Sequence, residues 1–152
     1  MRPWLAVAAA ALAVVVGCGE SRLPDPAAPK PAAFQLDGFS DLPLWLLSGY
    51  QIDAEAGIPV AVAVAGGAVR RLSVGYATRD DVDGESTQQV LDRFVGAMPD
   101  LGWSAGPRSG ETEARVQTWT KGDERLEVGA GKDGQRTTVL LLLGPTRDPA
   151  AR

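Results

Sequence analysis

The sequence contains no histidine and only one cysteine, Cys18, in 152 residues. Without histidine the chain lacks the commonest general base and metal ligand, and it cannot form a Ser-His or Cys-His catalytic pair. A lone cysteine has no disulfide partner within the chain and cannot build a cysteine-based zinc site. We therefore expect a protein that is not an enzyme, with no cofactor and no metal site. A hydrolase that uses carboxylates alone is an alternative, and it would require two acidic side chains to converge in a cleft.

A hydrophobic run of transmembrane length is also missing from the N-terminus. The apolar stretch at residues 4–16 is 13 residues long, whereas a membrane-spanning helix needs about 20. One cation, Arg2, precedes this stretch, and small residues follow it. That order is typical of a secretory signal peptide, so residues 1–17 are predicted to be a signal peptide.

The stretch ends in Val15-Val16-Gly17-Cys18, which resembles the bacterial lipobox. The resemblance implies cleavage between Gly17 and Cys18, a diacylglycerol on the Cys18 thiol and acylation of the new amino group. Two or three acyl chains hold a protein on a membrane stably, because each buried methylene contributes about 0.8 kcal/mol. The alternative is an ordinary secretory signal that ends near a small buried cysteine.

Gly19 follows the cysteine. In the sorting rule of the lipobox family, Asp at this position retains a protein at the inner membrane. Glycine therefore implies the outer membrane, with the domain facing the periplasm.

Prolines are concentrated between the lipobox and the rest of the chain. Pro24, Pro26, Pro29 and Pro31 fall within eight residues, a composition that favours extended polyproline geometry. We expect residues 18–40 to be a spacer, residues 41–145 to be one domain and residues 146–152 to be a flexible tail.

The charge balance gives no sign of a nucleic-acid partner. Removing residues 1–17 takes away one charge, that of Arg2, and leaves 14 basic and 19 acidic residues, a net charge of −5. Arg70-Arg71 is the only adjacent basic pair. Nucleic-acid binding usually needs a clustered basic surface, so no nucleic acid is expected as a partner.

Alternation of side chains predicts a hairpin within residues 57–78, with valines at 60, 62 and 64 on one strand and Leu72, Val74 and Tyr76 on the next. Each strand would have one buried face and one wet face. The turn would lie at Gly66-Gly67.

A capping box at residues 86–89 predicts a helix that runs to Pro99, and Gly102 then gives a stop. Three more strands are expected at about 113–120, 125–130 and 136–143. The last strand is apolar on both faces, so it should be central and covered on its second face. The fold class is α+β, a two-layer β-β-α-β-β-β arrangement with an antiparallel sheet and one helix packed on one face.

The frame of helix end and meander resembles a group of small bacterial envelope proteins of unassigned activity. They share a helix that ends in Leu-Pro-x-Leu-Gly-Trp, followed by strands with a Lys-Gly or Glu-Gly turn. The matching positions are Leu91, Phe94, Pro99, Leu101, Gly102, Trp103, Trp119, Gly122, Leu126 and Thr138. The resemblance covers residues 58–145 and supports the fold, but it implies no activity.

Six apolar residues in a row, at 42–47, lie between spacer and domain. One interpretation is that they pack across the open face or an edge of the sheet. The other makes Leu44, Trp45 and Leu46 an exposed patch for an envelope protein partner, or for a small apolar ligand or lipid on the open sheet face. Trp103 and Trp119 are expected to pack in the core or at its rim.

An acidic run at residues 80–85 precedes the expected helix. It does not fit the register of a calcium loop. We expect these carboxylates to interact favourably with the N-terminus of the helix, with weak binding of a divalent ion as the alternative.

Overall fold

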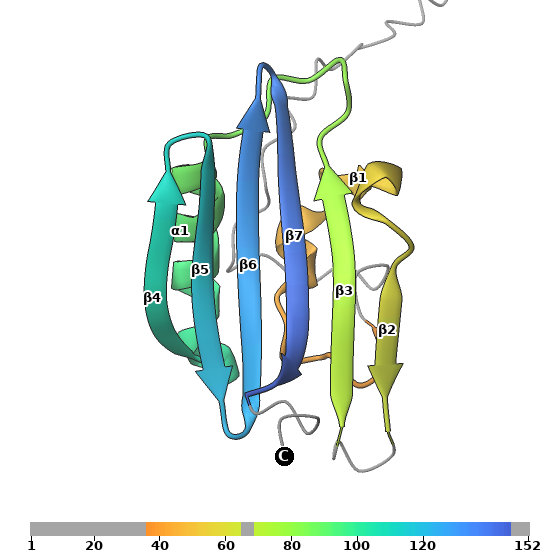
Figure 1. Ribbon diagram of the computed structural model, residues 1–152, viewed down its shortest axis with the longest axis vertical. Helices are drawn as coiled ribbons and strands as arrows, with labels where there is room; N and C mark the ends of the chain where they lie inside the picture. The colour runs from red at the N-terminus through yellow and green to blue at the C-terminus, as the bar shows by residue number, and fades with distance from the viewer. Residues whose placement is uncertain (1–35, 65–68, 147–152) are drawn as a thin grey trace, which may run out of the picture.

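The computed structural model describes residues 36–64 and 69–146. In this part of the chain, seven strands form one antiparallel sheet in the order β1-β3-β7-β6-β5-β4, and β2 also pairs with β3 (Figure 1). The strands are β1 (Gln51–Ile52), β2 (Val60–Ala63), β3 (Arg70–Ala77), β4 (Ser104–Glu111), β5 (Ala114–Lys121), β6 (Glu124–Asp133) and β7 (Arg136–Pro145). The helical elements are α1 (Thr87–Ala97) and the short 3-10 turns η2 (Leu44–Leu47), η3 (Ala54–Ala56) and η4 (Pro99–Leu101). The predicted α+β class, with an antiparallel sheet and one α-helix, is confirmed.

The helix α1 begins at the predicted capping box. The Ser86 hydroxyl accepts a hydrogen bond from the Gln89 amide at 3.2 Å, and the Gln89 side chain accepts one from the Ser86 amide at 2.9 Å. Pro99 has no amide hydrogen, so the helix gives way to η4 there. Gly102 then adopts a left-handed conformation, with φ of 85°, as the stop signal predicted.

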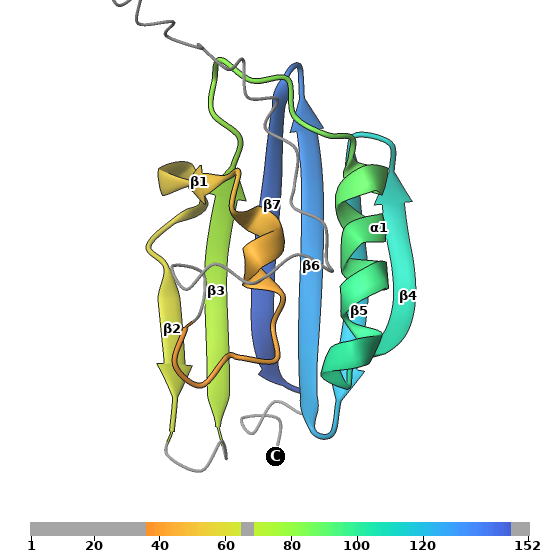
Figure 2. The same ribbon diagram turned by 180° about the vertical axis from the view of Figure 1, so that it is seen from behind.

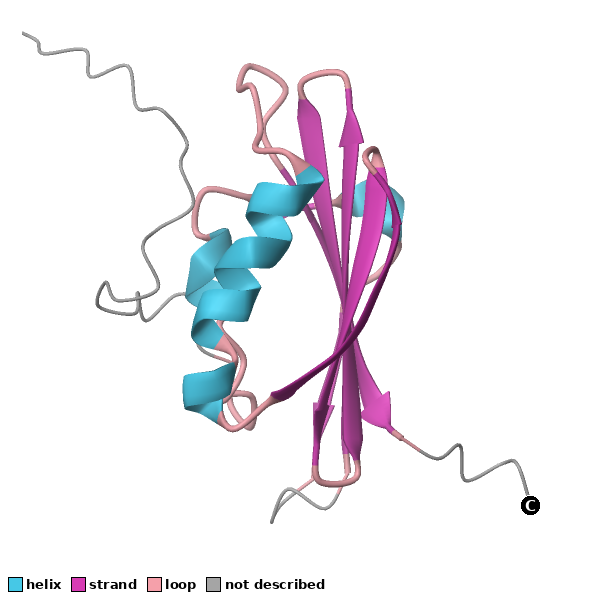
Figure 3. Cartoon of the chain, turned by 90° about the vertical axis from the view of Figure 1, so that its left-hand side faces the viewer, coloured by secondary structure: helices cyan, strands magenta, loops and turns pink. Residues whose placement is uncertain are grey.

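One layer of helices covers one face of the sheet. Figure 2 shows η2 beside α1 on the same face, and Figure 3 shows α1 on one side of the sheet seen edge-on. The fully buried large side chains between the layers are Trp119, Phe94, Leu44, Leu46, Leu47, Leu91, Met98, Leu126, Leu141, Val90, Val128 and Val139. Trp103 is buried too, so both tryptophans lie in the core as expected.

The apolar segment at 42–47 therefore does not cover the second face of the sheet. An eleven-residue helix covers only part of the sheet, chiefly β5 and β6. The segment extends the helical layer sideways on that same face (Figure 2). The opposite face, called the open face below, lacks a comparable layer among the described residues.

The two strands of the first hairpin place their apolar side chains on opposite faces. Leu72, Val74 and Tyr76 of β3 face the core, as predicted. In the register of β2 with β3, Val60 lies opposite Ser73 and Val62 lies opposite Arg71. Directly paired residues share a face, so the valines of β2 lie on the open face, where they are about half exposed. The alternation was identified correctly, but a buried face for β2 was wrong.

The strand β7 is central, between β3 and β6. Among the described residues, no layer covers it on the second face as expected, and Leu140 and Leu142 are 37% and 39% exposed on the open face. In the described part of the chain, η3 approaches this face closely, because a Cβ on Gly75 would overlap Ala56. Continuous apolar character in β7 thus reflects a central position without a second covering layer.

Two strands are additions to the predicted order. The sequence of β4, SAGPRSGE, has two glycines, a proline and no apolar alternation, so periodicity gave no signal. It is held by its neighbour β5, with a bulge between Ala105 and Arg108. The strand β1 has only two residues.

The folded part begins earlier than the predicted boundary at residue 41. Phe39 is 2% exposed and belongs to the core cluster. At the other end, the Thr146 amide donates to the Asp123 carbonyl at 2.7 Å. The expected turn at Gly66-Gly67 lies outside the described residues.

Candidate functional site

The most extensive polar site described is a set of four charged side chains, here called the Asp41 cluster: Asp41, Arg70, Lys121 and Glu124. Asp41 lies just before η2, Arg70 opens β3, Lys121 ends β5 and Glu124 begins β6. The β5–β6 turn and the start of β3 lie at the same end of the sheet (Figure 1). The segment at residues 36–43 runs past this end, which brings Asp41 to the three strand residues.

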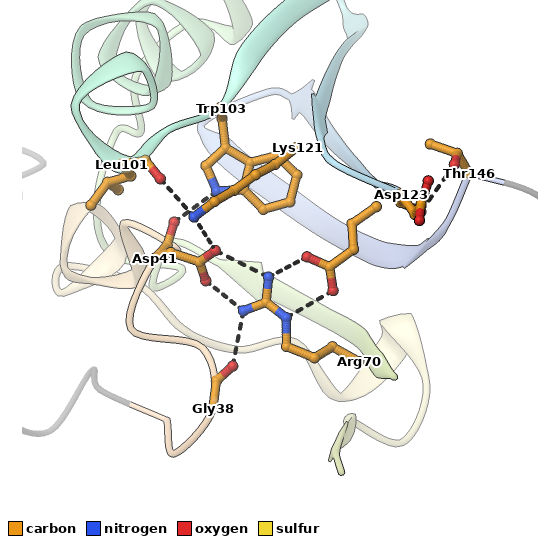
Figure 4. Close-up of polar contacts among 9 residues, drawn as sticks. Gly38, Asp41, Arg70, Leu101, Trp103, Lys121, Asp123 and Thr146 are labelled. Carbon is orange, nitrogen blue, oxygen red and sulfur yellow. Dashed lines mark hydrogen bonds and ion pairs between the residues drawn. The ribbon is translucent and has the colours of Figure 1, made fainter. Parts of the chain in front are cut away.

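The carboxylate of Asp41 lies between two cations (Figure 4). Arg70 donates to both of its oxygens, at 2.5 and 3.0 Å, and Lys121 Nζ donates at 2.8 Å. Arg70 also donates twice to Glu124, through Nε at 2.8 Å and through Nη2. One guanidinium thus holds two carboxylates, each through two hydrogen bonds, a geometry that favours Arg over Lys.

Three of the four side chains are largely withdrawn from water, and Lys121 is 36% exposed. The side chains of Arg70, Asp41 and Glu124 are 10%, 18% and 20% exposed. Burial raises the pKa of Asp41, but the hydrogen bonds and charges of Arg70 and Lys121 outweigh this effect, so the pKa lies below its ordinary value. The hydrogen bonds that Arg70 donates to Glu124 and Asp41 raise the pKa of Arg70. Asp41 and Arg70 therefore remain charged near neutral pH.

Further contacts join the cluster to the backbone and to aromatic rings. Trp103 Nε1 donates to the Asp41 carbonyl at 2.9 Å, and Arg70 donates to the Gly38 carbonyl at 2.9 Å. The Arg70 guanidinium lies 5.7 Å from the Phe39 ring centre. The carboxylates are thus engaged by cations, and the arrangement fixes residues 38–41 against the sheet. It provides structural attachment rather than a free acid or base.

Sequence reasoning did not identify this cluster, because the residues that form its ion pairs are 29, 54 and 80 positions apart in the chain. One signal was present. Arg70 has the same parity along β3 as Leu72 and Val74, so it falls on the face that was predicted to be buried. A buried cation needs a carboxylate partner.

A second candidate surface is the open face. Its exposed apolar side chains are Val60, Val62, Val64, Val69, Val116, Leu140 and Leu142. Gly129 of β6 lies opposite Leu140 of β7 on one side and opposite Val116 of β5 on the other. These three residues form an apolar row across three strands. The surface is lowest at the centre of the row, because Gly129 has no side chain.

The predicted docking patch does not lie on the surface. Leu44, Trp45 and Leu46 are 2%, 5% and 0% exposed, and all three belong to the core cluster. Their apolar character is accounted for by packing against the sheet beside α1. The predicted cleavage and lipidation residues, Gly17 and Cys18, lie outside the described residues.

The acidic run before α1 is distributed among separate ion pairs. Asp81 pairs with Arg79, Glu85 with Arg93 and Asp83 with Lys132. Within residues 36–64 and 69–146, no three Asp, Glu, His or Cys side chains form a group that could hold a metal ion.

None of the helices in the described part of the chain has the length and apolar character needed to cross a membrane. Comparison with family models, with curated proteins and with solved structures gave no match.

Proposed function

We propose that the protein is a lipid-anchored protein of the bacterial cell envelope whose domain acts as a non-enzymatic binding or structural module. The anchor would be the acyl groups on Cys18, and Gly19 favours the outer membrane with the domain on the periplasmic side. This part of the proposal rests on the lipobox resemblance and on the proline-rich spacer that follows it.

The open face is the observation that carries the binding role. The described chain starts at Leu36 and reaches the core through residues 36–43 on the α1 side of the sheet (Figure 2). The Asp41 cluster holds this segment there. The described residues therefore leave much of the opposite face uncovered, with Leu140, Leu142 and Val116 more than a third exposed, as binding of an envelope protein partner would require. Contiguous exposed apolar side chains commonly mark interaction surfaces.

A second candidate is a module that binds a small apolar ligand or a lipid on this same face. The glycine between Leu140 and Val116 favours it, because the missing side chain leaves room for an acyl chain across three strands. The two candidates differ in what accompanies the purified protein.

The variant Gly129→Asp tests both candidates. A Cβ at Gly129 would meet Leu140 and Val116 at 3.8 and 3.9 Å, ordinary contact distances, so the fold should tolerate the change while a charge enters the apolar row. The matched control is Gly96→Asp on α1, where a Cβ meets nothing within 4 Å. The lipidated protein is crosslinked in envelopes, captured and analysed for partner proteins, and a second sample is analysed for bound lipid by native mass spectrometry.

A stoichiometric partner that is lost with Gly129→Asp and retained with Gly96→Asp supports the protein-binding role. A co-purifying lipid with the same dependence supports the ligand-binding role. Neither species, or equal capture by both variants, contradicts a role for the open face.

The anchor is tested separately with Cys18→Ala. We expect this variant to lose the acyl mass and the membrane association of the parent. A variant that remains membrane-bound with an unchanged mass would contradict lipidation.

A further inference from the structure

The strand β2 forms one border of the sheet (Figure 1) and, apart from Pro59 just before it, carries neither a charge nor a bulge. All four of its residues are exposed, and the sequence is uncharged from residue 57 to residue 69. The opposite border, β4, carries Pro107, Arg108 and a bulge, which are common means of preventing edge pairing. The two edges of this sheet are therefore unlike.

The register defines which backbone groups of β2 are free. The Val64 amide donates to the Val69 carbonyl at 3.0 Å. Hydrogen-bonded pairs alternate in an antiparallel ladder, so Val62 and Val60 also direct their amides and carbonyls toward β3. Ala61 and Ala63 direct theirs outward. Pro59 is two residues before Ala61, so its backbone also points outward, but proline has no amide hydrogen to donate.

We propose that β2 pairs antiparallel with β2 of a second copy of this chain, about a two-fold axis at Val62 and perpendicular to the sheet. Ala61 of each copy then lies opposite Ala63 of the other, which gives up to four backbone hydrogen bonds and does not require the missing Pro59 amide. On the open face, Val62 meets its own equivalent, and Val60 meets Val64 of the other copy. Cross-strand pairs of β-branched residues stabilise such ladders.

The self-complementary sequence of β2 and the position of Leu36 both favour a second copy of this chain as the partner of the β2 edge. An uncharged strand brings no like charges together when it pairs with itself. The two-fold axis leaves both α1 layers on the same side of the extended sheet, so both copies have Leu36 on that side. Gly38, two residues later, approaches Ala63 so closely that a Cβ would overlap it. Two chains paired in this way can therefore both lead back to one membrane.

The membrane anchor of the proposed function supplies the concentration that this contact needs. Pairing along four residues buries much less than the roughly 1,200 Å² at the lower end of stable interfaces. Copies anchored in one membrane meet at an effective concentration far above that in solution. The inference rests on the proposed anchor in this respect, and the anchor is measured independently below.

Disulfide formation on vesicles tests the register. The lipidated full-length mature protein carries Val62→Cys or Val60→Cys, which replace side chains that are 47% and 46% exposed. Val62 sits on the axis in a non-hydrogen-bonded pair, where Cα atoms lie about 4.5 Å apart, within the range for a disulfide. The two Val60 residues are separated by four strand positions, about 13 Å. We expect rapid dimer formation on oxidation with Val62→Cys and at least tenfold less with Val60→Cys.

Several outcomes would overturn the pairing: equal crosslinking of the two variants, no crosslinking of either, or a disulfide from Val62→Cys to a different protein. The intact mass of the same samples reports the acyl groups on Cys18. A missing acyl mass contradicts the anchor but not the pairing. In that case the two variants are compared in solution at millimolar concentration with Cys18 replaced by alanine, and the same difference is required.

A charge pair gives a second test without thiols. Val62→Lys places like charges opposite each other across the axis, and Val62→Asp does the same with the opposite sign. We expect each variant alone to lose the dimer detected by amine-independent photocrosslinking, and an equimolar mixture to regain it. Loss in the mixture as well, with unfolding curves equal to that of the parent, would overturn pairing at Val62.

Discussion

Asp41 attaches the N-terminal segment to the sheet through both its side chain and its backbone carbonyl. Its side chain accepts hydrogen bonds from Arg70 and Lys121, and its carbonyl accepts one from Trp103. Arg70 belongs to β3, Lys121 belongs to β5, and Trp103 lies between η4 and β4. A single carboxylate thus connects residues 36–43 to β3 and β5 at once.

We expect Asp41→Asn to lower the free energy of unfolding by about 1–3 kcal/mol at pH 7, because two cations lose a charged partner. The pKa of Asp41 lies below its ordinary value of 3.8 in the folded protein. Its stabilising contribution is therefore complete above that value and is lost as the pH falls through the folded-state pKa. Urea unfolding between pH 7 and pH 3 should show the difference between parent and variant shrinking at the acid end.

The matched control is Asp81→Asn. Asp81 pairs with Arg79, but both side chains are more than 60% exposed, and exposed pairs contribute little. We expect a change within about 0.5 kcal/mol. A difference for Asp41→Asn that stays constant down to pH 3 would contradict the assignment of the pH dependence to Asp41.

At the scale of the elements, the sequence predicted those helices and strands whose apolar residues recur at a regular spacing or whose ends carry a capping residue. The capping box, Pro99 and Gly102 define α1 and its end within a few residues. The strand β4 had no such signal, since glycine, proline and polar residues occupy it. The alternation in β2 identified the strand, but which face is buried depends on the register with β3, which a sequence does not contain.

The Asp41 cluster was hidden for a related reason. Its ion pairs form only when the ends of β3, β5 and β6 are brought together by the sheet order. The segment at 42–47 was ambiguous from sequence, because an apolar run fits both a docking patch and a core element. Its burial is decided by the width of the sheet, which one helix cannot cover.

Leu46→Ala tests the core role of η2. Leu46 is fully buried, so the variant should lose about 2–5 kcal/mol of the free energy of unfolding. The control is Val95→Ala on α1, which is 42% exposed and should cost about 1 kcal/mol or less. Equal small losses, measured by urea unfolding at pH 7, would argue that η2 is not part of the core.

Ser86→Ala tests the capping box of α1. The variant removes the acceptor for the Gln89 amide and should cost about 0.5–2 kcal/mol. Ser109→Ala on the exposed edge strand β4 provides a serine control, with an expected change within about 0.5 kcal/mol. Thermal unfolding of both variants beside the parent provides the comparison, and a loss for Ser109→Ala as large as that for Ser86→Ala would contradict a specific effect of the cap.

At the scale of the whole molecule, the fold includes residues that the composition assigned to the spacer. Phe39 packs in the core and Gly38 accepts a hydrogen bond from Arg70. The boundary between spacer and domain therefore lies before the Asp41 cluster rather than within it.

Two shortened chains test this boundary. A chain that starts at Leu36 should unfold at the same temperature as the mature protein. A chain that starts at Leu42 loses Phe39 and Asp41 together and should be less stable by more than about 3 kcal/mol. Calorimetry at pH 7 distinguishes the two expectations, and equal stability of the two chains would place the boundary after Asp41.

The Asp41 cluster also sets the path of mechanical load. If the proposed lipid anchor and a partner on the open face were pulled apart, tension would enter at the start of the described chain and would meet the hydrogen bond from Arg70 to the Gly38 carbonyl and the buried Phe39 ring before it reaches Asp41. Ion pairs and the packing of one buried ring, Phe39, are short-range and rupture over small extensions, so residues 36–41 would detach before the seven strands separate. The tether between the membrane and the sheet would then lengthen by the few residues released. The cluster would thus be the contact that breaks first and leaves the sheet folded.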